Sequence, residues 1–288
     1  MKLFTLMALV FVCAITNAQS DPQKKDNDTI RIGNIIIIKN GKEGDNEKNN
    51  THITVERKRH RKASNVSTNW GVVDLGFANY NDETNYGATG GYLYNRPMTT
   101  PLGKNDFKLR TGKSVNVNIW FFMQRLNVIK HHVNLKYGMG LELNNYRYRS
   151  AANISYLEQN PYLPGQATSP IIIRDSVQFS KNKLAADYLT VPLMLNFSTS
   201  PGYTNKGLSI SVGVSAGYLY SQRNKQISDE RGKERNKGDY DLEKFKLSYV
   251  AELGLGPVRL YGSYSPTSFY SNGLNMKPYT LGVRLSNW

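Results

Sequence analysis

Residues 208–220 alternate between two kinds of side chain, and this period of two constrains the fold more than any other feature. They read LSISVGVSAGYLY, so every even-numbered residue is apolar or aromatic, and every odd-numbered residue except Leu219 is Ser or Gly. Successive side chains of a β-strand point to opposite faces, so the pattern predicts a strand with one apolar face. The large residues suit contact with lipid, and the small residues suit a narrow interior.

Seven further segments show the same period. They are residues 73–77, 115–123, 133–143, 189–197, 245–255, 258–264 and 279–285. Such lengths suit the ~9 to 11 residues with which a tilted strand crosses a bilayer. The sequence therefore predicts an all-β fold, an antiparallel up-and-down transmembrane β-barrel of about 8 strands, preceded by a signal peptide and a short polar N-terminal tract.

Composition agrees with strands that cross a membrane and not with helices that do. A mean hydropathy of −0.51 excludes a bundle of membrane helices, which would need several long apolar runs. A barrel exposes only alternate residues to lipid, so its average composition is polar.

The connections between the predicted segments alternate in length. Short links fall at residues 127–132, 198–206 and 256–257, and long links fall at residues 80–113, 144–183, 221–241 and 265–277. Outer-membrane barrels alternate short periplasmic turns with long outer loops. The pattern predicts a barrel in the bacterial cell outer membrane with both termini in the periplasm.

The first 69 residues are predicted to lie outside the barrel. Residues 1–18 are typical of a cleaved signal peptide, and they contain Cys13, the single cysteine. Residues 19–69 form a polar, partly disordered tract with one or two short strands at 29–38, broken at Gly33 and Asn34. The basic run 57–62 is interpreted as a solvated linker or as a contact for anionic lipid or an acidic partner. Residues 70–288 are assigned to the barrel.

Two residues interrupt the pattern. Pro192 falls inside a predicted strand, where it lacks a backbone N–H, so we expect a bulge or a locally opened pair. Trp288 is even-numbered, whereas the apolar residues of the last segment are odd-numbered. It is either a signal for the barrel-assembly machinery or an interfacial aromatic.

The face opposite the apolar one carries charges of both signs. With the apolar residues outward, seven charged side chains point into the lumen: Asp74, Lys136, Glu142, Lys246, Glu252, Arg259 and Arg284. A barrel of ~8 strands is filled by its side chains, so we interpret them as a plug of ion pairs. A narrow gated ion path is the alternative.

No arrangement typical of catalysis is present, and no cofactor is expected. His131 and His132 lie in a predicted turn, and adjacent strand residues point to opposite faces, so a shared metal is not expected. Tyr146, Arg147, Tyr148 and Arg149 alternate aromatics with cations above a predicted strand. They are interpreted either as contacts for lipopolysaccharide phosphates or as an aromatic girdle with cations that reach the headgroups.

Four segments carry a family resemblance: 28–33 (DTIRIG), 70–80 (WGVVDLGFANY), 187–193 (DYLTVPL) and 277–285 (KPYTLGVRL). Together they resemble the PorT-like outer-membrane β-barrel proteins of Bacteroidetes. The resemblance implies a fold and a membrane rather than an activity.

We expect a small closed barrel without catalysis, with a structural, adhesive or secretion-accessory role. Its expected partners are outer-membrane lipids and lipopolysaccharide, the assembly machinery, and a possible protein at the outer loops or N-terminal tract, but not nucleic acid. The alternative is a secreted soluble barrel that binds an apolar ligand; it would have its large apolar residues inside.

Overall fold

The computed structural model describes residues 29–32, 35–38, 64–149, 153–160, 170–200, 207–256 and 258–286. The chain divides into two compact units, residues 1–62 and 63–288. The predicted signal peptide, the basic run 57–62 and Trp288 lie outside the described residues. In the first unit, β1 (Thr29–Ile32) and β2 (Ile35–Ile38) pair antiparallel. The predicted break at residues 33 and 34 falls between these two strands and outside the described residues.

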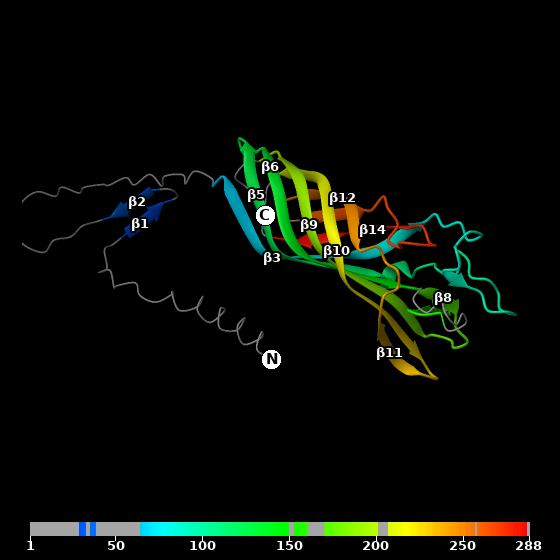
Figure 1. Ribbon diagram of the computed structural model, residues 1–288. Helices are drawn as coiled ribbons and strands as arrows, with labels where there is room; N and C mark the ends of the chain where they lie inside the picture. Colours follow the sequence, from blue (N-terminus) through cyan, green and yellow to red (C-terminus); the bar gives the residue numbers. More distant parts are fainter. Residues whose placement is uncertain are drawn as a thin grey trace, which may run out of the picture. The chain divides into compact units, whose positions relative to one another are not determined.

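Eight antiparallel strands of the second unit close into a barrel (Figure 1). They are β3 (Val66–Asp82), β5 (Val115–Ile129), β6 (Val133–Arg147), β9 (Lys181–Ser198), β10 (Leu208–Ser228), β12 (Phe245–Leu255), β13 (Val258–Tyr264) and β14 (Met276–Leu285). Each pairs with the next in the chain, and β14 pairs with β3 to close the ring. The predicted fold class is confirmed. β3 begins four residues before the predicted barrel boundary at residue 70.

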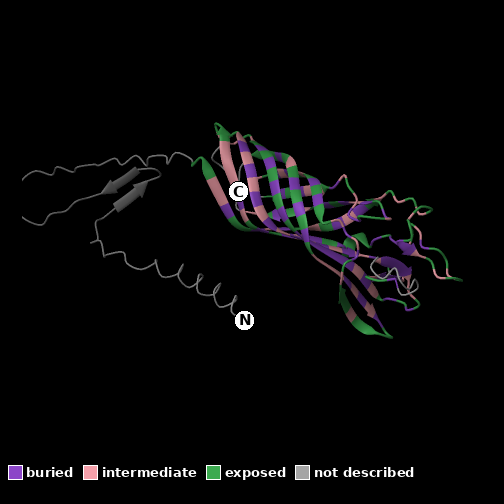
Figure 2. Cartoon of the chain, in the orientation of Figure 1, coloured by how far each residue is buried: buried purple, intermediate pink, exposed green. Residues whose placement is uncertain are grey.

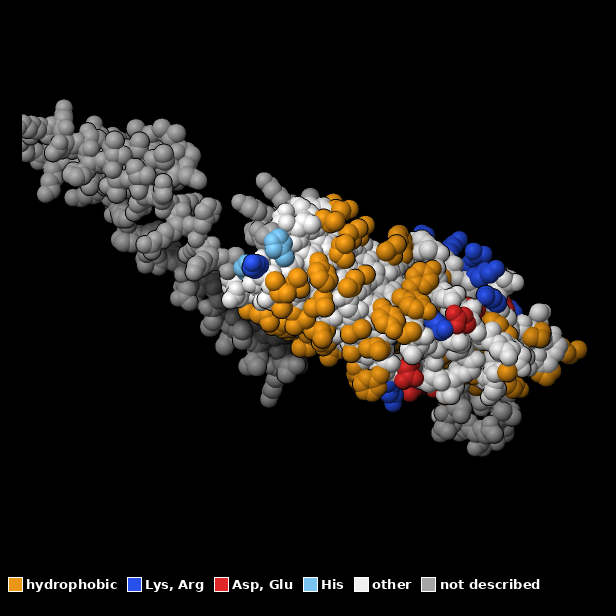
Figure 3. Space-filling view, turned by 90° about the horizontal axis from the view of Figure 1, so that it is seen from above, with side chains coloured by type: hydrophobic (Ala, Val, Ile, Leu, Met, Phe, Trp, Pro, Cys, Tyr) orange, Lys and Arg blue, Asp and Glu red, His pale blue; other side chains and the backbone are white. Residues whose placement is uncertain are grey.

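The side chains of the barrel wall alternate between outside and inside as predicted (Figure 2). Outward side chains such as Leu281 and Phe245 are 63% and 70% exposed, whereas Asp74 and Lys136 are 0% and 1% exposed. A barrel with its large apolar residues outside and charges inside does not have the arrangement expected of a soluble ligand-binding barrel. The apolar belt covers the barrel wall in Figure 3.

The predicted alternation of connections is also confirmed. Strands β5 and β6, β9 and β10, and β12 and β13 are joined by short segments at one end of the barrel, which we call the turn end. Long segments join the strands at the other end, which we call the loop end. β3 begins and β14 finishes at the turn end. The described residues contain no helix long and apolar enough to cross a membrane.

Pro192 has the local effect that the sequence predicted. In the pairing of β9 with β6, Leu193 lies opposite Tyr137 and Thr190 lies opposite Gly140. The two positions between these pairs, which include Pro192, are not paired. The register is the same on both sides of the gap, so the pair opens locally without a bulge.

Several strands continue past the apolar belt at the loop end. There β10 leaves β12 after Tyr218 and pairs instead with β11 (Gly232–Lys237), while β9 follows it to Ile227. A register shift between Leu219 and Ser221 marks a bulge at this change of partner. We call residues 181–187 of β9, residues 221–228 of β10 and β11 the strand extension.

The long connections fold into a head over the loop end. It contains β4 (Leu93–Tyr94), β7 (Ile154–Leu157), β8 (Ile171–Arg174) and the 3-10 turn η1 (Thr111–Lys113). β8 pairs with both β4 and β7 in a small sheet. Residues of this sheet, aromatic residues of the long connections and residues of the barrel strands form one buried cluster.

Candidate functional site

The seven predicted lumen charges are all buried, and every one of them forms an ion pair. Their exposed fractions range from 0% for Asp74 to 7% for Lys246. The pairs are Lys136–Glu252 at 2.7 Å, Lys246–Glu142 at 2.5 Å, Arg259–Glu252 at 3.4 Å, Arg284–Asp74 at 2.7 Å and Arg284–Glu252 at 2.5 Å. Burying such charges is costly unless they are paired and hydrogen-bonded.

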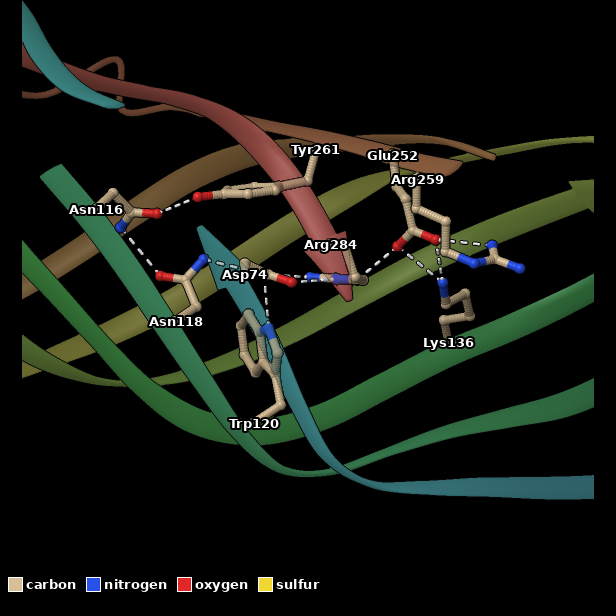
Figure 4. Close-up of polar contacts among 9 residues, drawn as sticks. All are labelled: Asp74, Asn116, Asn118, Trp120, Lys136, Glu252, Arg259, Tyr261 and Arg284. Carbon is tan, nitrogen blue, oxygen red and sulfur yellow. Dashed lines mark hydrogen bonds and ion pairs between the residues drawn. The ribbon is translucent and has the colours of Figure 1, made fainter. Parts of the chain in front are cut away.

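Glu252 is the centre of the larger group (Figure 4). It accepts from Lys136 on β6, Arg259 on β13 and Arg284 on β14. Because β6 stands across the lumen from β12, the Lys136–Glu252 contact ties opposite walls together. Glu252 supplies one negative charge to a group of three cations. Asp74, which pairs with Arg284, supplies a second negative charge.

Two ion pairs of opposite polarity join β6 to β12. Lys136 of β6 pairs with Glu252 of β12, whereas Glu142 of β6 pairs with Lys246 of β12. Lys246 also lies 4.4 Å above the ring of Tyr188. Each strand carries one acid and one base, so sliding either strand would separate both pairs at once. The arrangement fixes the register of strands that are not neighbours.

Amide side chains connect the two groups of charges. Asn144 donates to Glu142, Asn116 donates to Asn144 and Asn118, and Asn118 donates to Asp74. Such a chain of satisfied polar groups gains more than isolated pairs would in a low-dielectric interior. The lumen is therefore a single polar network from Glu142 to Glu252.

Aromatic residues complete the lumen network in ways that the alternation did not reveal. Trp120 donates its indole N–H to Asp74 at 2.7 Å, and its ring lies 5.5 Å from the Arg284 guanidinium. Tyr261 hydrogen-bonds to Asn116 from β13, although Asn116 belongs to β5. The ring of Tyr261 crosses Gly282 and Gly76, where a Cβ would collide with the neighbouring strand.

Little free volume remains inside this part of the barrel. A cavity of about 30 Å³ lies among Trp120, Glu252 and Tyr261. One water molecule needs ~10–15 Å³ of such volume, so the cavity has room for about two or three. The geometry is that of a filled interior.

The loop end of the lumen lies under the aromatic cluster of the head. Tyr80 of β3, Tyr146 of β6 and Tyr188 of β9 are buried in the same cluster as Phe269 and Tyr270. Tyr146 and Phe269 stack with ring centroids 5.2 Å apart. The interpretation of Tyr146 and Tyr148 as girdle residues is wrong, because both side chains point inward and are at most 2% exposed.

Several hydroxyl groups of this cluster are hydrogen-bonded to one another or to the backbone. Tyr156 bonds to both Tyr148 and Tyr270, and Tyr92 donates to the Tyr240 carbonyl at 2.5 Å. Burial raises the pKa of Tyr148 to about 12 and that of Tyr240 to about 12. The described part of the head therefore has a buried core of its own.

His131 and His132 occupy the turn between β5 and β6. Among the described residues, no group of three His, Cys, Asp or Glu side chains is placed to hold a metal ion. His132 contacts the backbone carbonyl of Ser198 at 2.9 Å, which joins two of the short turns.

A closed eight-stranded ring with an outward apolar belt and a charged interior defines a transmembrane β-barrel. The chain belongs to the family of the outer membrane protein beta-barrel domain, whose profile it matches over residues 77–269. The family places this barrel in the outer membrane. No curated protein matches the chain.

Two solved structures of Ail, the attachment invasion locus protein of Yersinia pestis, are similar in fold. One is a complex with the heparin analogue sucrose octasulfate; it is 12% identical, with a TM-score of 0.29. The other is 11% identical, with a TM-score of 0.30. Each alignment covers 76% of this chain and 98% of Ail.

Proposed function

We propose that this protein is a closed outer-membrane barrel that anchors an extracellular head and conducts no solute. The observation that carries this proposal is the filled lumen, in which the seven charges form one network under the aromatic cluster of the head. A channel would need a continuous polar path, whereas this lumen has buried aromatic rings at its loop end.

The proposed orientation has both termini in the periplasm and the head outside the cell. It is supported by the short turns at the end where β3 begins, because outer-membrane barrels keep their long loops outside. A structural or adhesive role suits this construction, since the head is a folded part of the chain beyond the belt. A secretion-accessory role for the N-terminal tract, a contact with the assembly machinery and the PorT-like relationship stay predictions. No catalytic role is proposed.

Conductance tests the closed lumen. The purified full chain in a planar bilayer is expected to give no steady current, and Arg284→Ala is expected to give none because the aromatic cluster still covers the loop end. A steady current in the unmodified protein that changes in Arg284→Ala would overturn the closed state in favour of a gated path.

Labelling of intact cells tests the orientation. Met98 in the head is fully exposed, and Lys130 is exposed in the turn between β5 and β6. Since Cys13 is the single cysteine, Met98→Cys and Lys130→Cys each add one thiol to the mature chain. A membrane-impermeant maleimide is expected to label only the Met98→Cys variant. The reverse result would invert the proposed orientation.

A further inference from the structure

A row of four cations crosses the outer face of the strand extension. Arg147 of β6 stands opposite Lys183 of β9, Lys183 opposite Lys225 of β10, and Lys225 opposite Arg235 of β11. Neighbouring strands lie ~4.8 Å apart, so the row is ~14 Å long. Lys181 and Lys233 flank it, each opposite Ile227. We call these six residues the cation row.

The row faces outward for a reason that lies in the strands themselves. Lys183 has the same parity as the lipid-facing Leu189, and Arg147 has the same parity as Leu143. In β10 the bulge at Tyr220 reverses the parity, so Lys225 faces outward although the even-numbered residues below the bulge did so. All four cations therefore share one face of the sheet.

Like charges directly opposite each other destabilise a sheet, so this row costs free energy in the isolated protein. The charge of Lys233, with those of Lys181 and Arg235, lowers the pKa of Lys225. Burial and the neighbouring cations Lys181, Lys225, Arg223 and Arg147 lower the pKa of Lys183. Among the described residues no carboxylate forms an ion pair with the six.

An acid at the edge of this face is already engaged. Asp187 pairs with Arg223 at 2.5 Å, directly below the row. The other face of the extension is also occupied: Asn224 donates to Asn182 at 3.0 Å, and Gln226 donates to the Ile154 carbonyl at 3.1 Å. Together with the strand pairing, these bonds fix the spacing of the cations.

The height of the row matches the polar layer of a membrane. Leu143 is the last apolar outward residue of β6, and Arg147 lies four residues beyond it. At ~3.3 Å per residue and a tilt of ~40°, this is a rise of ~10 Å above the belt. Headgroup layers extend ~5–8 Å beyond the hydrocarbon, and long cationic side chains reach back toward them. Figure 3 shows Lys and Arg side chains beyond one end of the hydrophobic band.

We infer that the cation row is a binding site for the phosphate groups of lipid A in the outer leaflet, and this inference rests on the proposed orientation with the head outside the cell. The acyl chains of the lipid would lie against the apolar belt of β6, β9 and β10, and its phosphates would contact the row above. A site that combines an apolar wall with fixed cations suits this amphipathic ligand better than a soluble polysaccharide.

The test uses the purified full chain in detergent and native mass spectrometry. Diphosphoryl lipid A is titrated against lipid A from which both phosphates have been removed. The unmodified protein is expected to prefer the phosphorylated form by about tenfold or more. The triple variant Lys183→Gln, Lys225→Gln, Arg235→Gln is expected to lose this preference. Equal binding of both lipids to the unmodified protein would overturn the site.

A matched control removes three cations elsewhere in the head. Lys104, Lys108 and Lys113 are exposed on the connection between β3 and β5, outside the strand extension. Their triple Gln variant is expected to retain the preference for phosphorylated lipid A. Loss of the preference in this control as well would show a general effect of net charge and overturn the assignment to the row.

Two further arms keep the result decisive. The single variants Lys225→Gln and Lys225→Arg replace the triple variant if it does not fold, and only Lys225→Gln is expected to weaken binding. A heparin-derived oligosaccharide serves as a soluble polyanion. If the row variants lost this oligosaccharide but kept lipid A, a polysaccharide site would replace the proposed one. Because binding is measured in detergent, its failure is separate from a failure of the orientation test.

Discussion

Arg284 on the last barrel strand grips Asp74 on the first strand with two hydrogen bonds. Nε donates to Oδ1 at 2.7 Å and Nη2 donates to Oδ2 at 2.8 Å, and the two residues stand directly opposite in the register of β14 and β3. The pair lies 210 positions apart in the sequence, at the seam where the sheet closes on itself. Ring closure therefore includes a buried, bidentate ion pair as well as backbone hydrogen bonds.

Removing one partner of this seam pair should be strongly destabilising. Asp74→Ala leaves Arg284 with Glu252 alone and deprives Trp120 and Asn118 of their acceptor. Loss of one member of a buried pair costs about 3–5 kcal/mol of the free energy of unfolding. Urea unfolding in lipid vesicles measures it, with the exposed Asp229→Ala as the control. A change in Asp74→Ala no larger than that in Asp229→Ala would contradict the prediction.

The reciprocal pairs between β6 and β12 should be energetically coupled. Glu142→Gln and Lys246→Met are each expected to destabilise the barrel, because each leaves a buried charge without its ion-pair partner. The double variant is expected to be less destabilised than the sum of the single variants by about 1–3 kcal/mol. The same unfolding experiment gives the cycle. Strict additivity would mean that the pair does not join the two strands.

The seam should not tolerate a side chain at Gly282. A Cβ there would lie 2.5 Å from Gly76 Cα, which is backbone and cannot move aside. Gly282→Ala is expected to lower the fraction of protein that shows heat-modifiable migration in gels. Gly262 on the next strand is the matched control, because its Cβ would find its nearest neighbour at 3.4 Å. Equal folding of the two Ala variants would refute the tight approach of β3 and β14.

Alkali should loosen the head before the barrel. The pKa of Tyr148 is raised by burial to about 12, whereas an unfolded tyrosine titrates near ~10. The folded head thus keeps a proton that the unfolded chain loses, so its contribution to stability is complete below pH ~10 and declines as the pH rises toward 12. Tyrosinate absorbance is expected to show a late phase that is reduced in Tyr148→Phe. A single phase near pH 10 in the folded protein would contradict this.

The wall of the barrel could be predicted from the sequence because lipid imposes one simple rule on it. Each outward residue must be apolar, so the period of two reports the strands and the direction of their side chains. The same parity separated the seven lumen charges from the apolar residues. Parity does not give the register between strands. The partners of Glu252 could therefore not be assigned from the sequence.

Features beyond the belt could not be predicted, because outward residues need to be apolar only where they contact lipid. Asp187 has the parity of the lipid-facing Leu189, yet it is 2% exposed because Arg223 and the neighbouring strand cover it. Tyr146 and Tyr148 are separated by Arg147 as girdle residues would be, but they pack inward against residues of distant loops. Their environment depends on contacts between segments more than 100 positions apart, such as Tyr156 with Tyr270.

The bulge at Tyr220 divides β10 into a part that contacts lipid and a part that lies beyond it. Below it, even-numbered residues of β10 meet lipid; above it, odd-numbered residues carry the outward charges. Without the extra residue, Arg223 and Lys225 would face the packed interior of the head, and Asn224 would face outward. One inserted amino acid therefore lets a continuous strand obey one pattern in the membrane and the opposite pattern outside it. Substitutions that suit one surface can accumulate without altering the direction of side chains on the other.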